Sequence, residues 1–131
     1  MDVAVRLMDQ QGPNYLLLKA CTFNYLDSVK FLLSQGTDVQ CVDQNQATPL
    51  HLASSNGNLE IVKYLVKMGA NLHSIDKDQA TPLHYACYSG QWKTIKYLIT
   101  QGADLYCLDK DKRSPLQIVL QTEAKVSNDA K

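Results

Sequence analysis

Two of the three histidines fall in a repeated pentapeptide, and their imidazole nitrogens are the first candidates for chemistry. Ala-Thr-Pro-Leu-His occurs at residues 47–51 and again at 80–84, an offset of 33 residues. Imidazoles can bind metal ions or transfer protons. If the two copies form neighbouring helices, His51 and His84 lie about 10 Å apart, too far to share one metal ion. We therefore predict a structural role for both, and an exposed contact role for His73.

The four cysteines, Cys21, Cys41, Cys87 and Cys107, form no C-x-x-C pair of the kind that binds zinc. Cys21 and Cys87 are two repeat periods apart, as are Cys41 and Cys107, so the members of each pair should be about 20 Å apart. A disulfide requires Cα atoms within about 7 Å. The sequence predicts four reduced thiols that fill small packing sites.

No other pattern of catalytic residues is present in the sequence. It contains no glycine-rich phosphate loop, no G-x-S-x-G motif, no H-E-x-x-H motif and no closely spaced carboxylate pair on an apolar wall. The basic residues Lys110, Lys112 and Arg113 alternate with Asp109 and Asp111, which is typical of a solvated turn rather than a phosphate-binding patch. We therefore predict no enzyme activity, no metal and no cofactor.

The repeated pentapeptide is the start of a helix. Thr48 can cap that helix and Pro49 can be its first residue, where the missing N–H costs nothing. Gly57 should end it, because glycine adopts the left-handed conformation that stops helices. A second helix with an apolar face is predicted from about Leu59 to Met68.

A period of 33 residues with the pattern T-P-L-H-x-A is the signature of one repeat family. Residues 48–53 (Thr-Pro-Leu-His-Leu-Ala) and 81–86 (Thr-Pro-Leu-His-Tyr-Ala) match it, so the chain resembles ankyrin-repeat proteins. The resemblance implies an all-α solenoid of helix-turn-helix units with short β-hairpin loops. It also implies that the motif histidine is structural and bonds loop backbone. The residues expected to hold the repeats together are Thr48, Pro49, His51, Gly57, Thr81, Pro82, His84, Gly90 and Gly102.

The period divides one domain, residues 1–131, into successive units. The first unit is degenerate: Asn14 stands where a cap is needed, and Asn24 replaces the helix-ending glycine. In the last unit Ser114 and Gln117 form a capping box, but no second apolar helix follows. That polar tail either frays or belongs to a longer array. The predicted units are 10–42, 43–75, 76–108 and a partial 109–131, with 1–9 as a cap over the first repeat or the remnant of a preceding unit.

The hairpin tip departs from the ankyrin pattern, which has glycine four positions into the unit. Here that position holds Gln46, Gln79 and Lys112, and Pro13 in the first unit. A left-handed backbone costs a residue other than glycine roughly 1 kcal/mol. The tip is therefore either strained or folded as another turn, and we expect its long side chains to form a polar row available to a partner.

The resemblance implies that contact residues lie at the hairpin tips and at the ends of the first helices. Aromatic residues dominate interface hot spots, so Phe23, Tyr25 and Tyr88 are the leading candidates. Trp92 aligns with the apolar Leu26 and Leu59, which favours packing. The full predicted contact set is Phe23, Tyr25, Gln44, Asn45, Gln46, Ser55, Asn56, Lys77, Asp78, Gln79, Tyr88, Ser89, Trp92, Lys110, Asp111, Lys112 and Arg113.

The overall composition limits the partner classes. Thirteen basic and thirteen acidic residues give no net charge, which argues against nucleic acid or an anionic membrane surface as the partner. No apolar run is long enough to span a bilayer, and no signal peptide or N-glycosylation motif is present. We expect an intracellular location, cytoplasmic, nuclear or both.

The predicted function is a non-catalytic protein–protein interaction module, monomeric as a domain, that binds a protein or peptide on its concave face and hairpin tips. No small-molecule substrate is expected. Two alternatives stay open from the sequence. The chain is a recruitment or regulatory segment of a larger enzyme or membrane protein, or it is a small inhibitor that occludes an enzyme's cleft.

Overall fold

The computed structural model describes residues 3–129, and the side chains of residues 12–122. Within these residues the chain is helical and has no β-strand. The helices are α1 (Val3–Thr22), α2 (Leu26–Ser34), α3 (Pro49–Asn56), α4 (Leu59–Lys67), α5 (Pro82–Tyr88), α6 (Trp92–Thr100) and α7 (Pro115–Asp129).

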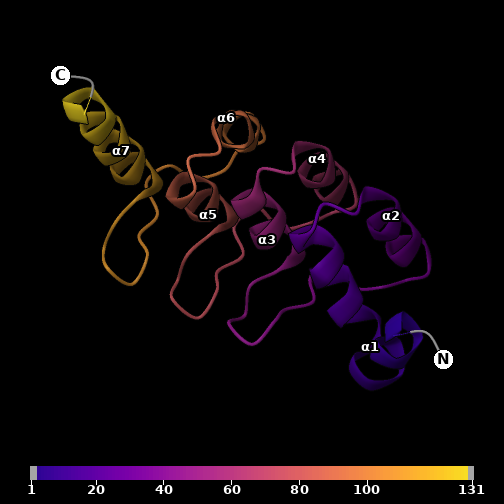
Figure 1. Cartoon of the computed structure of the whole chain (residues 1–131). Coiled ribbons are helices and arrows are strands. Elements are labelled where there is room, and N and C mark those ends of the chain that lie inside the picture. The colour runs from indigo at the N-terminus through magenta and orange to yellow at the C-terminus, as the bar shows by residue number, and fades with distance from the viewer. Residues whose placement is uncertain (1–2, 130–131) are drawn as a thin grey trace.

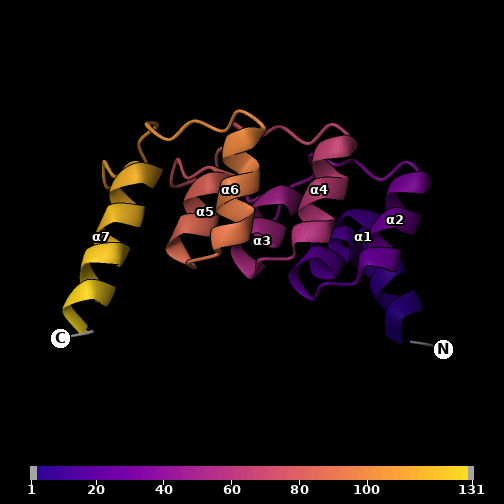
Figure 2. The same cartoon turned by 90° about the horizontal axis from the view of Figure 1, so that it is seen from above.

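The helices form two rows, as Figure 1 shows. The first helix of each unit, α1, α3, α5 or α7, belongs to an inner row, and α2, α4 and α6 form an outer row. Three long loops project on the side of the inner row away from the outer row (Figure 1). The turned view in Figure 2 shows the units stacked along one axis, with α1 and α7 at opposite ends. We call the loop segments 42–47, 75–80 and 108–113 finger 1, finger 2 and finger 3.

The inner helices begin as the motif predicts. Thr48 is the N-cap of α3, and its side chain accepts a hydrogen bond from the backbone N–H of His51, whose side chain in turn bonds the backbone N–H of Thr48. Thr81 and His84 form the same capping box on α5. Each pair satisfies two backbone donors that a helix start would otherwise leave unpaired.

The core lies between the two rows of helices and is continuous along the stack. Inner-row residues such as Leu50 and Leu83 are fully or almost fully buried, and so are the outer-row residues Ile61, Leu65 and Leu98. The burial of Ile61 and Leu65 confirms the apolar face predicted for the helix from about Leu59 to Met68. Each unit therefore depends on its neighbours to cover its apolar surface, as in other solenoids.

The first unit differs from its prediction. Helix α1 is interrupted at Gly12, whose backbone is left-handed (φ 79°, ψ 174°), and its second half begins with Pro13. The expectations that Asn14 caps this helix and that Pro13 occupies a hairpin tip are therefore wrong. Glycine permits the break, and proline then starts a helix at no hydrogen-bonding cost. The proposed packing of residues 1–9 over the first repeat lies outside the described side chains.

The fourth unit begins as predicted. Ser114 accepts a hydrogen bond from the backbone N–H of Gln117 at 3.2 Å, and Gln117 Oε1 accepts one from the Ser114 N–H at 2.8 Å. Helix α7 then continues through the polar stretch as far as Asp129.

The ends of the inner helices confirm the left-handed positions expected from the sequence. Gly57 (φ 68°) and Gly90 (φ 66°) adopt this conformation, and Asn24 (φ 63°) does so where glycine is missing. Asparagine tolerates this region better than most residues, because its short polar side chain can hydrogen-bond locally.

Candidate functional site

Each finger is closed by an aspartate at the same repeat position. Oδ1 of Asp43 accepts hydrogen bonds from the N–H groups two and four residues later, at 2.8 and 3.0 Å. Asp76 and Asp109 do the same at 2.8–3.0 Å. This closing role of the three aspartates was not among the predictions from the sequence. The signal was available, because Asp recurs there three times and commonly stabilises turns in this way.

Of the two conformations expected for the finger tips, a strained left-handed backbone or another turn, the structure has the first. Gln46 (φ 63°), Gln79 (φ 64°) and Lys112 (φ 61°) all have left-handed backbones. The three side chains are exposed. The turn is held in this conformation by the aspartate just described and by the hydrogen bond from the Gln46 N–H to the Asp43 carbonyl at 3.0 Å, with its equivalents in the other two fingers.

The fingers are joined to one another through their backbones. The Lys77 N–H donates to the Asn45 carbonyl, and the Lys110 N–H donates to the Asp78 carbonyl, both at 2.9 Å. Lys110 also forms an ion pair with Asp78 at 3.3 Å, but both side chains are exposed, so this pair contributes little. The backbone bonds make the three fingers one connected surface.

The two motif histidines connect each inner helix to the following finger. His51 Nε2 bonds the Ala80 carbonyl at 2.8 Å, and His84 Nε2 bonds the Arg113 carbonyl at 2.9 Å. Because Nδ1 of His51 accepts from the Thr48 N–H, its proton belongs on Nε2 and the ring is neutral. Burial lowers the pKa of His51 and so favours this state. Both histidines thus bond loop backbone, as the family resemblance implies.

Metal and thiol chemistry find no support at these positions. Cys87 follows His84 by three residues, but across the described side chains no three His, Cys, Asp or Glu residues gather to hold a metal ion. All four cysteines are free thiols, as predicted, and three are buried. Burial raises the pKa of Cys21 and of Cys87 to about 12, so both are protonated at neutral pH and are poor nucleophiles.

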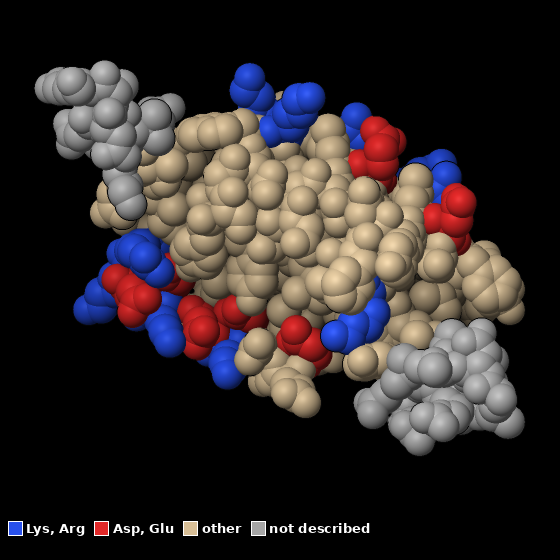
Figure 3. All heavy atoms as spheres, in the orientation of Figure 1, with Lys and Arg blue, Asp and Glu red and all other residues tan. Residues whose placement is uncertain are grey.

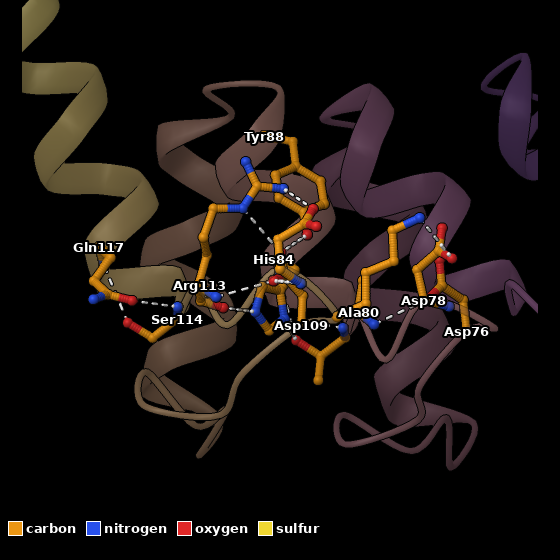
Figure 4. A network of polar contacts seen from close by, with 12 residues as sticks. Asp76, Asp78, Ala80, His84, Tyr88, Asp109, Arg113, Ser114 and Gln117 are labelled. Carbon is orange, nitrogen blue, oxygen red and sulfur yellow. Dashed lines mark hydrogen bonds and ion pairs between the residues drawn. The ribbon is translucent and has the colours of Figure 1, made fainter.

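Two tyrosines of α5 hold fingers against the inner helices, as Figure 4 shows for one of them. Tyr85 donates a hydrogen bond to Asp76 Oδ2 at 2.5 Å, and Tyr88 donates one to Asp109 Oδ2 at 2.6 Å. Burial and the nearby carboxylate raise the pKa of each tyrosine. The guanidinium of Arg113 lies 5.4 Å from the centre of the Tyr88 ring, and its Nε lies 3.3 Å from Asp109 Oδ2.

Two shallow cavities lie where the fingers meet the inner helices. One, of about 310 Å³, has walls from α5 and from fingers 2 and 3, including Tyr85, Tyr88, Asp78 and Asp111. The other, of about 600 Å³, has walls from α1, α3 and finger 1, including Tyr15, Leu18, Val42, Gln44 and Leu52. Neither is enclosed, and neither contains a catalytic arrangement of side chains.

Most of the predicted contact residues lie on the fingers or at the ends of the inner helices α3 and α5. Ser55 and Ser89, from neighbouring inner helices, are joined by a hydrogen bond of 3.1 Å between their hydroxyls. The members of the predicted set that lie on the fingers or at the ends of α3 and α5 are Gln44, Asn45, Gln46, Ser55, Asn56, Lys77, Asp78, Gln79, Tyr88, Ser89, Lys110, Asp111, Lys112 and Arg113.

Three aromatic candidates lie elsewhere. Phe23 and Tyr25 are in the turn between α1 and α2, with exposed fractions of 57% and 59% and ring centres 6.1 Å apart. Trp92 is the first residue of the outer helix α6 and is 42% exposed, so the expected packing involves only part of its side chain. Phe23 follows the end of α1 at the repeat position of Asn56 and Ser89, whereas Trp92 belongs to the outer row.

Charge is unevenly placed on the surface. Figure 3 shows acidic and basic side chains side by side along the edge formed by the fingers, and a broad area without charged side chains beside it.

Among the helices that the structure describes, none is both long and apolar enough to cross a membrane.

The comparisons with known proteins agree with this architecture. A search of curated proteins returns no match to the chain. A family model described as ankyrin repeats, in three copies, matches residues 16–109, which is well over half of the chain. The matched span runs from the second half of α1 to the first aspartate of finger 3, and so includes the bridge from His51 to Ala80 and the link between fingers 1 and 2. The chain belongs to the ankyrin-repeat family.

Proposed function

We propose that this chain is a non-catalytic interaction module that binds a partner protein along the side formed by its fingers and inner helices. Ankyrin repeats generally mediate protein–protein interactions and are typically non-catalytic. The observation that supports this surface most strongly is the direct hydrogen bonding between neighbouring fingers. It fixes the relative positions of three loops that otherwise have many exposed polar groups.

A rigid surface favours binding because little conformational freedom is lost when a partner docks. Here the rigidity has three sources: the aspartate in each finger, the histidine bridge from each inner helix, and the tyrosine bonds to Asp76 and Asp109. The side chains that vary between units lie on top of this framework. The framework thus sets the geometry, and the variable residues set the specificity.

The proposed partner is a protein, or a peptide segment of a protein, and we propose that binding takes place inside the cell. Interleaved charges on the fingers fit a polar protein surface better than a nucleic-acid backbone, which would require a predominantly basic face. We propose that the domain acts as a monomer, so that the finger side is free for the partner.

A pull-down with matched variants tests the proposal. Ser89→Arg and Gln44→Arg place a bulky charged side chain on the finger side, whereas Ser34→Arg places the same group on outer helix α2, at an exposed serine. Proteins captured by the tagged domain are identified by mass spectrometry. We expect a partner whose capture is lost with the first two variants and retained with the third. Equal capture by all three variants would place the interaction elsewhere on the molecule.

A further inference from the structure

Three exposed aliphatic side chains occupy the same repeat position at the base of the three fingers. They are Val42, Ile75 and Leu108, and each directly precedes the aspartate that closes its finger. Their exposed fractions are 51%, 55% and 51%. Single exposed aliphatic residues are common on soluble proteins. Recurrence of one at every finger is different, because each such residue loses the benefit of burial unless something covers it. We call these residues the aliphatic row.

The hydrogen bonding fixes the spacing of the aliphatic row. Within finger 1 the two sides of the loop are joined by the Asp43 N–H and the Ala47 carbonyl at 3.0 Å. Fingers 1 and 2 are joined by the Lys77 N–H and the Asn45 carbonyl at 2.9 Å. One repeat therefore advances by two hydrogen-bonded chain spacings of about 4.8 Å each, or about 9.5 Å. Successive members of the row are separated by about this distance.

This spacing selects among the conformations of a bound segment. A polyproline-II helix rises 3.1 Å per residue with three residues per turn, so every third side chain faces the same way at a spacing of about 9.3 Å. A β-strand presents same-face side chains at about 6.6 or 13 Å, which misses the row. An amphipathic α-helix buries a wide apolar stripe, whereas the exposed finger positions beyond the row are polar, such as Gln44 and Lys77.

The charge of the fingers and their arms predicts the charge of the bound segment. The three arm-and-finger segments, residues 38–47, 71–80 and 104–113, contain seven aspartates and four basic residues, a net charge of −3 in a chain whose overall net charge is zero. A bound segment with basic side chains between its apolar ones complements this charge.

One member of the row also borders the surface proposed above. Val42 lines the cavity of about 600 Å³ together with Tyr15, Leu18 and Leu52, which belong to the inner helices. The repeat places Ile75 and Leu108 at the equivalent position of the next two fingers. The cavity of about 310 Å³ at fingers 2 and 3 is lined by neither of them, so the row borders a cavity of the inner helices only at Val42.

We propose that the aliphatic row docks an extended polyproline-II segment of a partner protein, with an aliphatic side chain at every third residue and basic residues between them. This proposal rests on the proposed function and specifies the chemistry of the partner. The three aliphatic side chains of the segment cover Val42, Ile75 and Leu108 in register, and its basic side chains complement the net negative charge of the arm-and-finger segments.

Synthetic peptides test the register. Fluorescein-labelled (Leu-Pro-Lys)₅ has the proposed spacing and charge, and (Leu-Pro-Glu)₅ reverses the charge. A third peptide has the composition of the first but an irregular leucine spacing. Binding is measured by fluorescence anisotropy at 50 mM and 300 mM salt. We expect (Leu-Pro-Lys)₅ to bind at least tenfold more tightly than either control peptide, and the difference from (Leu-Pro-Glu)₅ to shrink at high salt.

Matched triple variants locate the binding. Val42→Ser, Ile75→Ser and Leu108→Ser together remove the row, and Phe31→Ser, Met68→Ser and Ile99→Ser together remove three exposed apolar side chains from the outer-helix side. Circular dichroism and thermal unfolding establish that both variants fold. We expect at least tenfold weaker peptide binding for the first variant and no change for the second. Equal binding of the regular and irregular peptides, or no binding of (Leu-Pro-Lys)₅ at 1 mM, would overturn the proposal.

The outcomes also separate this proposal from the broader one. If a partner captured in the pull-down depends on Ser89 and Gln44 but tolerates loss of the aliphatic row, the finger side binds proteins by another chemistry and the polyproline-II proposal is wrong. If peptide binding depends on the row while no partner capture responds to Ser89→Arg, the broader assignment of the finger side to a protein partner is the one that fails.

Discussion

The hydroxyl of Tyr88 lies 2.6 Å from Oδ2 of Asp109 and joins the end of α5 to the base of finger 3. This bond crosses the boundary between the third and fourth units. The equivalent positions one and two units earlier hold Ser55 and Thr22, which cannot reach as far. Tyr88 is therefore both a candidate contact residue and part of the framework. A Tyr88→Ala substitution would disturb both roles, so it cannot by itself show that Tyr88 binds a partner.

Removing only the Tyr88 hydroxyl separates these roles. We expect Tyr88→Phe to lower the free energy of unfolding by about 1–2 kcal/mol, since a buried carboxylate loses one donor. Urea denaturation followed by circular dichroism measures this loss. Tyr25→Phe is the control, because Tyr25 is largely exposed and should change stability by less than about 0.5 kcal/mol. Equal effects of the two variants would contradict a structural role for the Tyr88 hydroxyl.

Asp109 makes stability depend on acid. Its burial would raise the pKa, but hydrogen bonds from Tyr88 and from the backbone of Arg113 and Asp111, with the Arg113 charge, outweigh burial and hold the pKa below its ordinary value of 3.8. A lowered pKa in the folded state stabilises the protein above the unfolded value, and this contribution is lost as pH falls through the folded value. We expect Asp109→Asn to be destabilised at pH 7 and to converge with the natural protein below about pH 4.

The matched variant for this experiment is Asp43→Asn. Asp43 closes finger 1 through the same two backbone bonds, but Leu52 and Thr22 stand where tyrosines bond the other two aspartates. Its substitution should therefore cost less at pH 7 than that of Asp109. If urea denaturation gives equal losses for the two variants, the tyrosine does not strengthen the finger.

The His51 bridge predicts a second dependence on pH. Burial lowers the pKa of His51 from its ordinary value of 6.5, so folding favours the neutral ring. The stability that this provides is complete above pH 6.5 and declines as pH falls toward the folded-state pKa. Protonation also prevents Nδ1 from accepting the hydrogen bond of the Thr48 N–H. The natural protein should thus lose stability between pH 7 and pH 5 partly through this residue.

His51→Gln tests this dependence with a substitution that the chain itself contains. Gln117 builds the same capping box on α7 without an imidazole. We expect His51→Gln to lose about 1–2 kcal/mol at pH 8 with the bond to the Ala80 carbonyl, and the gap from the natural protein to narrow toward pH 5. Thermal unfolding at several pH values measures both. His73→Gln, at an exposed position, should leave the profile unchanged.

The parts of the fold that could be predicted from the sequence depend on local chemistry repeated at a fixed period. The caps at Thr48 and Thr81, the left-handed glycines and the outer-helix apolar faces each follow from a few neighbouring residues. The histidine bridge followed from the family resemblance. At Gly12 and Pro13 the 33-residue period gave a wrong prediction. It placed a hairpin tip at Pro13, where the sequence favours the start of a second helix.

The candidate surface was harder to predict because it depends on contacts between units. Tyr85 and Tyr88 meet Asp76 and Asp109 only once a finger has folded back against an inner helix, and no local pattern gives that geometry. The aliphatic row was visible in the sequence as Val42, Ile75 and Leu108, but apolar residues at a regular period are also expected of a core. Only their exposure in the structure distinguishes the two.

The left-handed fingertips give a test of strain. Gln79 has a φ of 64°, a conformation that costs a residue other than glycine roughly 1 kcal/mol. Glycine relieves that cost but adds backbone entropy to the unfolded chain, so the expected net gain for Gln79→Gly is up to about 1 kcal/mol. Lys77→Gly, in the same finger but outside the left-handed region, should instead lose about 0.5–1 kcal/mol. Chemical denaturation measures the free energy of unfolding of both variants. A lower value for Gln79→Gly than for the natural protein would mean that the Gln79 side chain stabilises the finger by more than the strain costs. If Gln79→Gly gains stability yet binds a captured partner more weakly, the missing glycine has a functional reason: the amide at the fingertip contacts the partner.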